Sequence, residues 1–210
     1  MFRRILVILA ACLPMVALAQ EAPDALVKRV TGEVLAIIKA DKELQGGNPR
    51  KVAELAEQKV LAHFDFPRMT RLAVGRNWAQ ASDAQKAALT NEFRTLLVRT
   101  YSASLAAYRN QTIEVKPTKM AAADKEATVR TAVLQQGGPS IPIDYAMERA
   151  DGGWKVYDVV IDGASLVTTY RSSFNDQIQK GGVDGLVTAL AERNRAPGSA
   201  PAAKGDAKKK

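Results

Sequence analysis

The length, composition and charge of the chain exclude several classes of protein. Hydrophobic residues make up 47% of the 210 residues and charged residues 25%, a composition too apolar for a disordered chain. One cysteine excludes an intrachain disulfide framework and a metal site built from several cysteines. The net charge of +8 would suit nucleic-acid binding only if the charge lay on the folded body.

Residues 1–19 have the features of an export signal. Arg3 and Arg4 precede an apolar run that is too short to span a bilayer, and Ala17-Leu18-Ala19 forms a small-x-small cleavage site. Cleavage at this site would leave a mature chain without cysteine, which suits an oxidising compartment. We therefore expect the mature protein in the periplasm.

A second interpretation of the same segment is a lipoprotein signal. Leu9-Ala10-Ala11-Cys12 resembles a lipoprotein box, in which Cys12 would become a lipidated N-terminus. The apolar run continues past Cys12 to Leu18, and this continuation favours cleavage after Ala19.

Residues 196–210 are predicted to form a disordered basic tail. They are rich in Pro, Ala and Gly, lack large apolar side chains and end in Lys208-Lys209-Lys210. The signal carries a charge of +2 and the tail +3, so residues 20–195, the expected single domain, carry only +3. Nucleic acid is therefore not an expected partner, and weak attraction to anionic membranes is the alternative role for the tail.

Helical spacing of apolar residues dominates the first half of the domain. Asp24 is the expected N-cap of the first helix, Asn48-Pro49 opens the second, and Ser82 and Gln85 have capping-box spacing. The expected helices cover residues 24–39, a segment that starts at residues 48–49, residues 65–78 and residues 82–108.

The period then changes from 3.6 to 2, which predicts strands. Alternation covers residues 113–116, 128–133 and 143–148, and a fourth strand, residues 154–161, follows the turn at Asp151-Gly152-Gly153. Both faces of this fourth strand are apolar. The alternation predicts that Tyr157, Val159 and Ile161 face inward and that Trp154, Val156 and Val160 face the other side, and a second covered face is the alternative. Four adjacent strands with short turns predict an antiparallel sheet packed on helices through one face.

Two further helices are predicted after the sheet. Ser165 is the expected N-cap of a helix that ends at Gly181-Gly182, and a last helix runs from about Asp184 to Arg193. The order of helices, sheet and helices is typical of an α+β fold.

The sequence offers no convincing catalytic or metal-binding motif. His63 is the only histidine, and Asp65, two residues further, would not face it on a helix. A hydrolase would depend on His63, whereas a capping or surface role is favoured. Asp158 and Asp162 could share a face, but no third metal ligand lies nearby in the sequence. Their carboxylates are therefore expected to form hydrogen bonds in turns and loops. We therefore predict neither an enzyme nor a metal site.

The remaining candidate site is apolar and faces the predicted helices. Periodicity alone favours a filled core over a cavity for these side chains. The candidate residues are Phe93, Leu97, Tyr101, Leu105, Tyr108, Ile113, Val115, Val129, Val133, Ile143, Tyr145, Met147, Tyr157, Val159, Ile161, Tyr170 and Phe174.

Several motifs resemble those of the toluene-tolerance, or MlaC, family. The resemblance covers about residues 24–193, with Val74 and Ala164 as mild departures. It is carried by residues 152–159 (GGWKVYDV) and 161–167 (IDGASLV), by Tyr170-Arg171 and Phe174, and upstream by Phe64-Asp65-Phe66, Met69, Val74-Gly75, Trp78, Gln85, Phe93, Leu97 and Tyr101.

The family resemblance implies a periplasmic phospholipid carrier. It implies a bent four-stranded antiparallel sheet, related to NTF2-like folds, wrapped by helices around a deep apolar pocket. The cargo would be a glycerophospholipid, with no cofactor, carried by a monomer. The implied partners are an outer-membrane lipoprotein-porin complex and an inner-membrane ABC transporter, which together maintain outer-membrane lipid asymmetry. A binding protein for another apolar ligand, such as a quinone, a fatty acid or a solvent, is the alternative.

Overall fold

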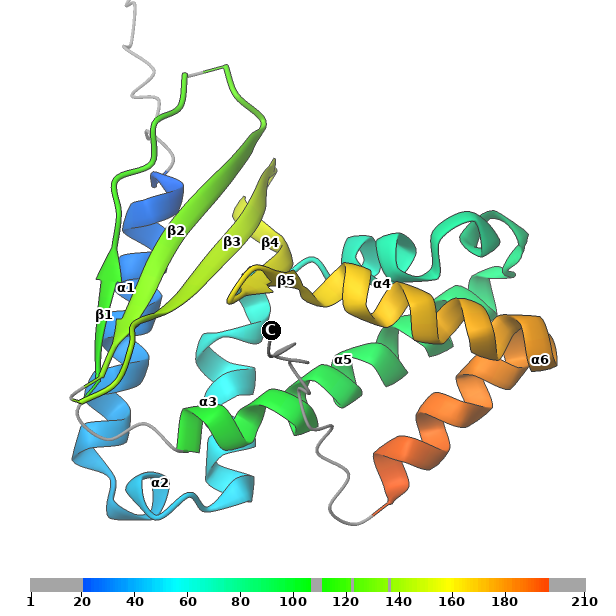
Figure 1. The fold of residues 1–210 in the computed structure, drawn as a ribbon, viewed down its shortest axis with the longest axis horizontal. Coiled ribbons are helices and arrows are strands. Elements are labelled where there is room, and N and C mark those ends of the chain that lie inside the picture. Colours follow the sequence, from blue (N-terminus) through cyan, green and yellow to red (C-terminus); the bar gives the residue numbers. More distant parts are fainter. Residues whose placement is uncertain (1–20, 107–110, 122, 136, 197–210) are drawn as a thin grey trace, which may run out of the picture.

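Helices precede and follow one antiparallel sheet in the computed structural model, as the sequence predicts (Figure 1). The structure describes residues 21–106, 111–121, 123–135 and 137–196. The predicted signal and all but the first residue of the predicted tail lie outside these ranges. The helices are α1 (Pro23–Ala40), α2 (Lys42–Gln45), α3 (Pro49–Lys59), α4 (Phe66–Val74), α5 (Asp83–Ala106) and α6 (Leu166–Arg195), with short 3-10 turns η1 (Leu61–His63) and η2 (Gly75–Gln80).

The sheet contains the four predicted strands and one very short addition. Strands follow chain order from β1 to β5, and every neighbouring pair is antiparallel. The two-residue β5 was not predicted, because two residues carry no alternation. The strands are β1 (Thr112–Val115), β2 (Glu126–Leu134), β3 (Ile141–Ala150), β4 (Gly153–Ile161) and β5 (Ala164–Ser165).

Side-chain caps begin most of the predicted helices. The backbone N–H of Gln85 donates to Ser82 Oγ at 3.2 Å, and the backbone N–H of Ser82 donates to Gln85 Oε1 at 2.9 Å. These reciprocal bonds confirm the capping box of α5. Ser165 Oγ accepts from the Thr168 N–H at 3.0 Å and caps α6. Asp24 was wrongly expected to cap α1: that helix begins at Pro23, and Asp24 Oδ2 instead accepts from the Thr118 N–H at 3.0 Å.

Helix α6 consists of two helical segments joined at a glycine, as the Gly181-Gly182 pair predicts. Gly182 has φ 66° and ψ −167°, a backbone conformation that residues with a side chain rarely adopt. After the kink, Leu186 and Leu190 join the main core. The Asn194 side-chain amide donates to the Glu92 carbonyl oxygen at 2.9 Å, which fixes the second segment on α5.

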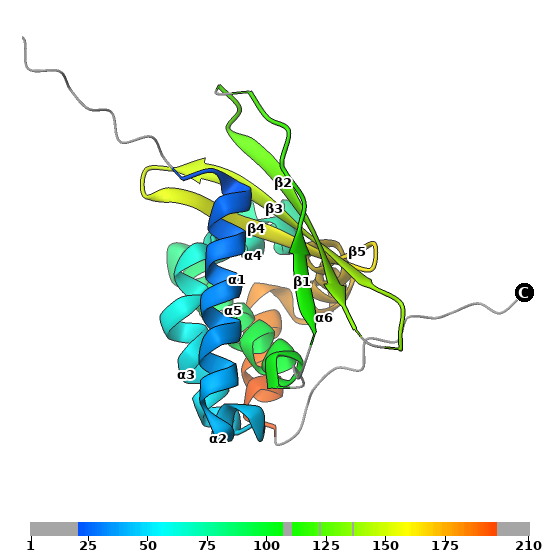
Figure 2. The ribbon, with the colours of Figure 1, turned by 90° about the vertical axis from the view of Figure 1, so that its left-hand side faces the viewer.

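The helices lie on one side of the sheet, and we call the sheet face toward them the inward face. Figure 2 shows α1 beside the β1 edge, with α5 and α6 behind it. The main core lies between the inward face and helices α1, α4, α5 and α6, while a smaller apolar cluster joins the later part of α1 to α2 and α3. The sheet therefore has one apolar face under the helices, as predicted.

A β-bulge in β4 corrects the prediction for Tyr157. Ala146 pairs with Asp158 and Met147 with Val156, which leaves Tyr157 without a partner. The extra residue transfers Trp154 and Val156 to the inward face, where both are buried. Tyr157 leaves that face, and the guanidinium of Arg68 lies 3.6 Å from its ring centre. Arg68 also pairs with Glu126 and Glu148 on the opposite face of the sheet.

Candidate functional site

The inward face consists of a closed end and an accessible end. At the closed end Val129 and Met147 are 0% exposed and Val159 is 7% exposed. At the accessible end the apolar side chains are only half-buried although helices cover this side of the sheet: Ile113, Val115, Val133, Ile143 and Ile161. Close packing in a protein core normally removes apolar surface from water, and these side chains keep part of theirs accessible.

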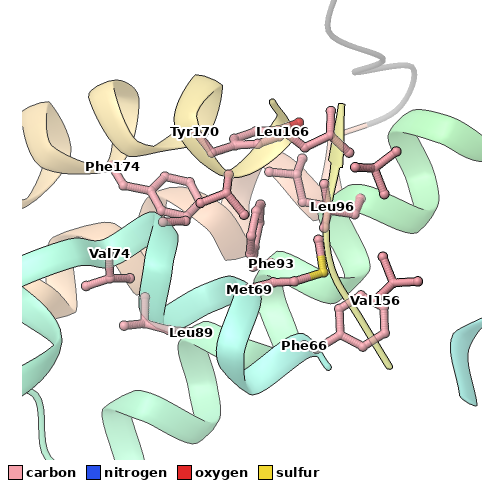
Figure 3. Close-up of a cluster of buried hydrophobic side chains, with 14 of the residues drawn as sticks. Phe66, Met69, Val74, Leu89, Phe93, Leu96, Val156, Leu166, Tyr170 and Phe174 are labelled. Carbon is pink, nitrogen blue, oxygen red and sulfur yellow. The ribbon is translucent and has the colours of Figure 1, made fainter. Parts of the chain in front are cut away.

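Aromatic side chains fill the interior beside the closed end. The rings of Tyr170 and Phe174 both meet Phe93 edge-on, with ring centres 5.0 Å apart in each pair (Figure 3). Edge-to-face contacts of this kind add to the stability gained by burial. Phe93, Phe174 and the neighbouring Leu97 are buried, so these predicted site residues form core beside the closed end and do not line the accessible end.

Tyr101 on α5 and Tyr145 on β3 are partly buried tyrosines that pack against the main core. Burial, together with the hydrogen bond to the Tyr170 hydroxyl, raises the pKa of Tyr101 to about 12. Burial also raises the pKa of Tyr145, although a hydrogen bond with Thr131 opposes this shift. Tyr145 lies between its cross-strand partners Val129 and Val159, which belong to the closed end.

The structure brings most of the predicted site residues together. Eleven of the seventeen lie on the inward face or on the α5 surface turned toward it: Leu97, Tyr101, Ile113, Val115, Val129, Val133, Ile143, Tyr145, Met147, Val159 and Ile161. Ile161 pairs with Ile143 on the same face, and Phe93, Tyr170 and Phe174 form the adjoining core. Tyr157 lies elsewhere, Tyr108 lies outside the described residues, and the side chain of Leu105 is not described.

Sequence reasoning missed several residues of the inward face, among them Trp154, Val156 and Thr131. Trp154 and Val156 were assigned to the other side because the bulge is invisible in the alternation. Thr131 was omitted because it is polar, yet it is buried, and its hydroxyl donates to the Ile143 carbonyl oxygen at 2.7 Å. Its position between Val129 and Val133 in the alternation was the available signal.

The titratable groups singled out in the sequence have structural roles. Asp65 Oδ1 accepts from the Arg68 N–H at 2.8 Å and caps α4. Asp158 accepts from the Ser165 hydroxyl at 2.6 Å and from the Val167 N–H at 3.1 Å, which ties β4 to the start of α6. Burial, followed by the positive charges of Arg29 and Lys155, lowers the pKa of His63.

The part of the chain that the structure describes holds no group of three or more His, Cys, Asp or Glu side chains arranged to bind a metal ion. Within the same residues, no helix combines the length and apolar character needed to span a bilayer. An α+β domain that keeps accessible apolar side chains beneath its helices belongs to the class of binding proteins for apolar molecules.

Comparison with known proteins assigns the family. The family model described as MlaC protein matches residues 28–192, so the chain belongs to the MlaC family, and the resemblance noted in the sequence is confirmed. The toluene tolerance protein Ttg2D of Pseudomonas putida is 28% identical over 206 residues, 95% of each chain. The intermembrane phospholipid transport system binding protein MlaC of Haemophilus influenzae is 22% identical over 184 residues, 86% of each chain.

A solved structure is also similar to the chain over most of its length. The phospholipid-binding protein from Ralstonia solanacearum, in complex with a phospholipid, is 45% identical with a TM-score of 0.76. The match covers 81% of this chain and 96% of the other.

Proposed function

We propose that the mature chain is a periplasmic phospholipid carrier and that residues 20–195 form its lipid-binding domain. The observation that carries the proposal is the accessible apolar end of the inward face, in a fold shared with a protein solved with a phospholipid. The acyl chains would lie between this end of the sheet and helices α1 and α5. Phospholipid is then the cargo, and the protein is a carrier and not an enzyme.

The energy of acyl-chain transfer sets the depth that such a site needs. Each buried CH₂ group contributes about 0.8 kcal/mol, so two chains of roughly sixteen carbons represent on the order of 25 kcal/mol relative to water. A carrier that exposed one chain would lose about half of this free energy and could not compete with a bilayer. We therefore infer a deep pocket for both chains, as in the NTF2-like folds, with the phosphate in water at its mouth.

The names of the relatives support a place for this carrier between two membranes. One relative is named as the binding protein of an intermembrane phospholipid transport system. We infer that this chain, as a monomer, moves glycerophospholipid between an outer-membrane lipoprotein-porin complex and an inner-membrane ABC transporter. Such exchange would maintain the lipid asymmetry of the outer membrane.

Native mass spectrometry of the gently purified chain tests the cargo and its position. We expect diacyl phospholipid masses on the wild type and reduced lipid occupancy in Val133→Trp, because the indole would fill accessible space on the inward face. Leu134→Trp is the matched control, since Leu134 follows on the same strand but is exposed on the other face. A second variant, Leu97→Trp, enlarges a buried side chain of α5 that packs in the main core beneath the sheet.

Two outcomes contradict the proposal in different ways. A quinone, a fatty acid, a solvent or an empty protein would replace the phospholipid assignment with the alternative apolar ligand. Full phospholipid occupancy in folded Val133→Trp and Leu97→Trp would retain the cargo but place it elsewhere.

A further inference from the structure

A groove of about 770 Å³ lies between α4, η2 and the first segment of α6. Figure 1 shows these elements at the opposite end of the molecule from β1 and α1. Two motifs singled out in the sequence, Val74-Gly75 and Tyr170-Arg171, meet here, although they are almost one hundred residues apart. The groove is lined by Arg71, Leu72, Val74, Gly75, Arg76, Asn77, Thr168, Arg171, Ser172 and Asn175.

The groove carries three exposed arginines and no acidic side chain in its lining. Among the described residues, Arg71, Arg76 and Arg171 have no carboxylate within ion-pair distance, whereas Arg29, Arg50, Arg68 and Arg94 all pair with glutamates. Arg171 Nε donates to the Leu72 carbonyl oxygen at 3.0 Å, which holds its guanidinium over the groove. The unneutralised charge attracts an anionic group.

The remaining lining suits a peptide. Leu72 adds apolar surface, while Asn77 and Asn175 add amides that both donate and accept hydrogen bonds. Gly75 turns the chain from α4 into η2 with φ 64° and ψ −136°, a conformation that is essentially restricted to glycine. An extended peptide that contains both apolar and acidic residues could use all of these features. Its apolar side chains would contact Leu72, its backbone would hydrogen-bond with the amides, and its carboxylates would pair with the arginines.

The cargo and a membrane surface fit the groove less well. The buried side chains of Met69, Phe93 and Phe174 belong to the closed core between α4, α5 and α6, so the phosphate of a lipid on the inward face would lie far from the three arginines. A flat bilayer contacts the protruding parts of a protein surface, whereas a groove can accommodate an extended peptide.

We propose that this groove docks an acidic, extended segment of a partner protein. The docking does not require the cargo assignment, because the groove and the accessible end of the inward face have no lining residue in common and both can be occupied together. A partner segment bound here would hold the protein while its apolar face remains free.

Fluorescence anisotropy tests the proposal with the full mature chain. The probe is a fluorescein-labelled peptide of about twelve residues in which Asp and Glu alternate with Ala and Leu, compared with the same peptide carrying Asn and Gln. We expect saturable binding of the acidic peptide alone, weakened roughly tenfold by Arg71→Glu/Arg76→Glu at low salt. Arg171 is left unchanged because its bond to Leu72 also supports the fold.

The matched control is Lys42→Glu/Arg130→Glu, which changes the net charge equally at exposed sites outside the groove. This control should bind the peptide like the wild type, and both double variants should melt normally and keep their lipid occupancy. Equal weakening by both pairs, no saturable binding to the wild type, or loss of lipid from the groove variant alone would each overturn the proposal. Preferential, groove-dependent binding to phosphatidylglycerol vesicles would overturn it in favour of a membrane surface.

Discussion

The two ends of the inward face contain similar residues but differ in packing. Val129, Met147 and Val156 at the closed end have almost no accessible surface, whereas Val133, Ile143 and Ile161 at the accessible end remain half-buried on the same strands. Helix α4 explains part of the contrast, because its Phe66 and Met69 fill the space against β4 beside the bulge (Figure 3). At the other end the cover comes from α1 beside β1 and β2, and apolar surface remains accessible beneath it.

This difference shows that an apolar stripe in the sequence identifies the side of the sheet that faces the helices. It does not show how closely the helices pack against that side. Alternation along a strand determines which side chains share a face. Whether the opposing layer reaches them depends on the lengths and angles of helices that come from distant parts of the chain. The same residue types therefore support the fold at one end and offer a binding surface at the other.

Removing an aromatic ring from the core should have the largest effect. Phe93→Ala is expected to lower the free energy of unfolding by about 3–5 kcal/mol, because it empties a fully buried position that contacts Tyr170 and Phe174. Ile143→Ala should cost less than about 2 kcal/mol, since its side chain is already partly accessible. Urea unfolding of delipidated protein measures both. Equal losses would remove the distinction between the two ends.

Adding a large side chain should also distinguish the two ends, because only the closed end should lose stability. Met147→Trp is expected to destabilise the delipidated protein by about 1–3 kcal/mol, because the closed end has no space for an indole. Val133→Trp should change the free energy of unfolding by less than about 1 kcal/mol, since half-buried side chains surround that position. Thermal melts of both variants give the measurement. A greater loss in Val133→Trp would mean that the accessible end has no room for the added ring.

The smallest effect is expected at His63, outside both ends. Its pKa lies below the ordinary 6.5 because its ring is partly buried and near Arg29 and Lys155, so the unfolded chain binds a proton first as the pH falls. The free energy of unfolding should therefore be unaffected by His63 well above pH 6.5 and decrease below it. His63→Asn should lose less stability than the wild type between about pH 7.5 and 5.5 in urea titrations.

The same variant also tests the hydrolase alternative. His63→Asn should leave phospholipid occupancy and the outer-membrane barrier unchanged, because the proposed carrier uses no base. Loss of barrier function in a folded, lipid-loaded variant would restore a catalytic interpretation.

Features carried by short stretches of chain were predictable. The reciprocal bonds of Ser82 and Gln85, the cap at Ser165 and the break at Gly182 each depend on residues within a few positions. Asp24 and Tyr157 were assigned wrongly because their partners are distant in sequence. The Thr118 N–H draws Asp24 away from its helix terminus, and a one-residue bulge against Ala146 transfers Tyr157 to the other face.

By itself, the sequence determined the family, the order of helices and strands, and most of the side chains that face inward, because motifs and periodicity are local properties of the chain. Only the tertiary structure decided that the inward face is filled against α4 and accessible toward Val133 and Ile143. It also decided that Arg71, Arg76 and Arg171 share one groove. Both outcomes depend on where distant segments of the chain lie. The physical reason is that packing depends on contacts between helices and strands that are far apart in the sequence, and a local pattern of residues does not specify those contacts.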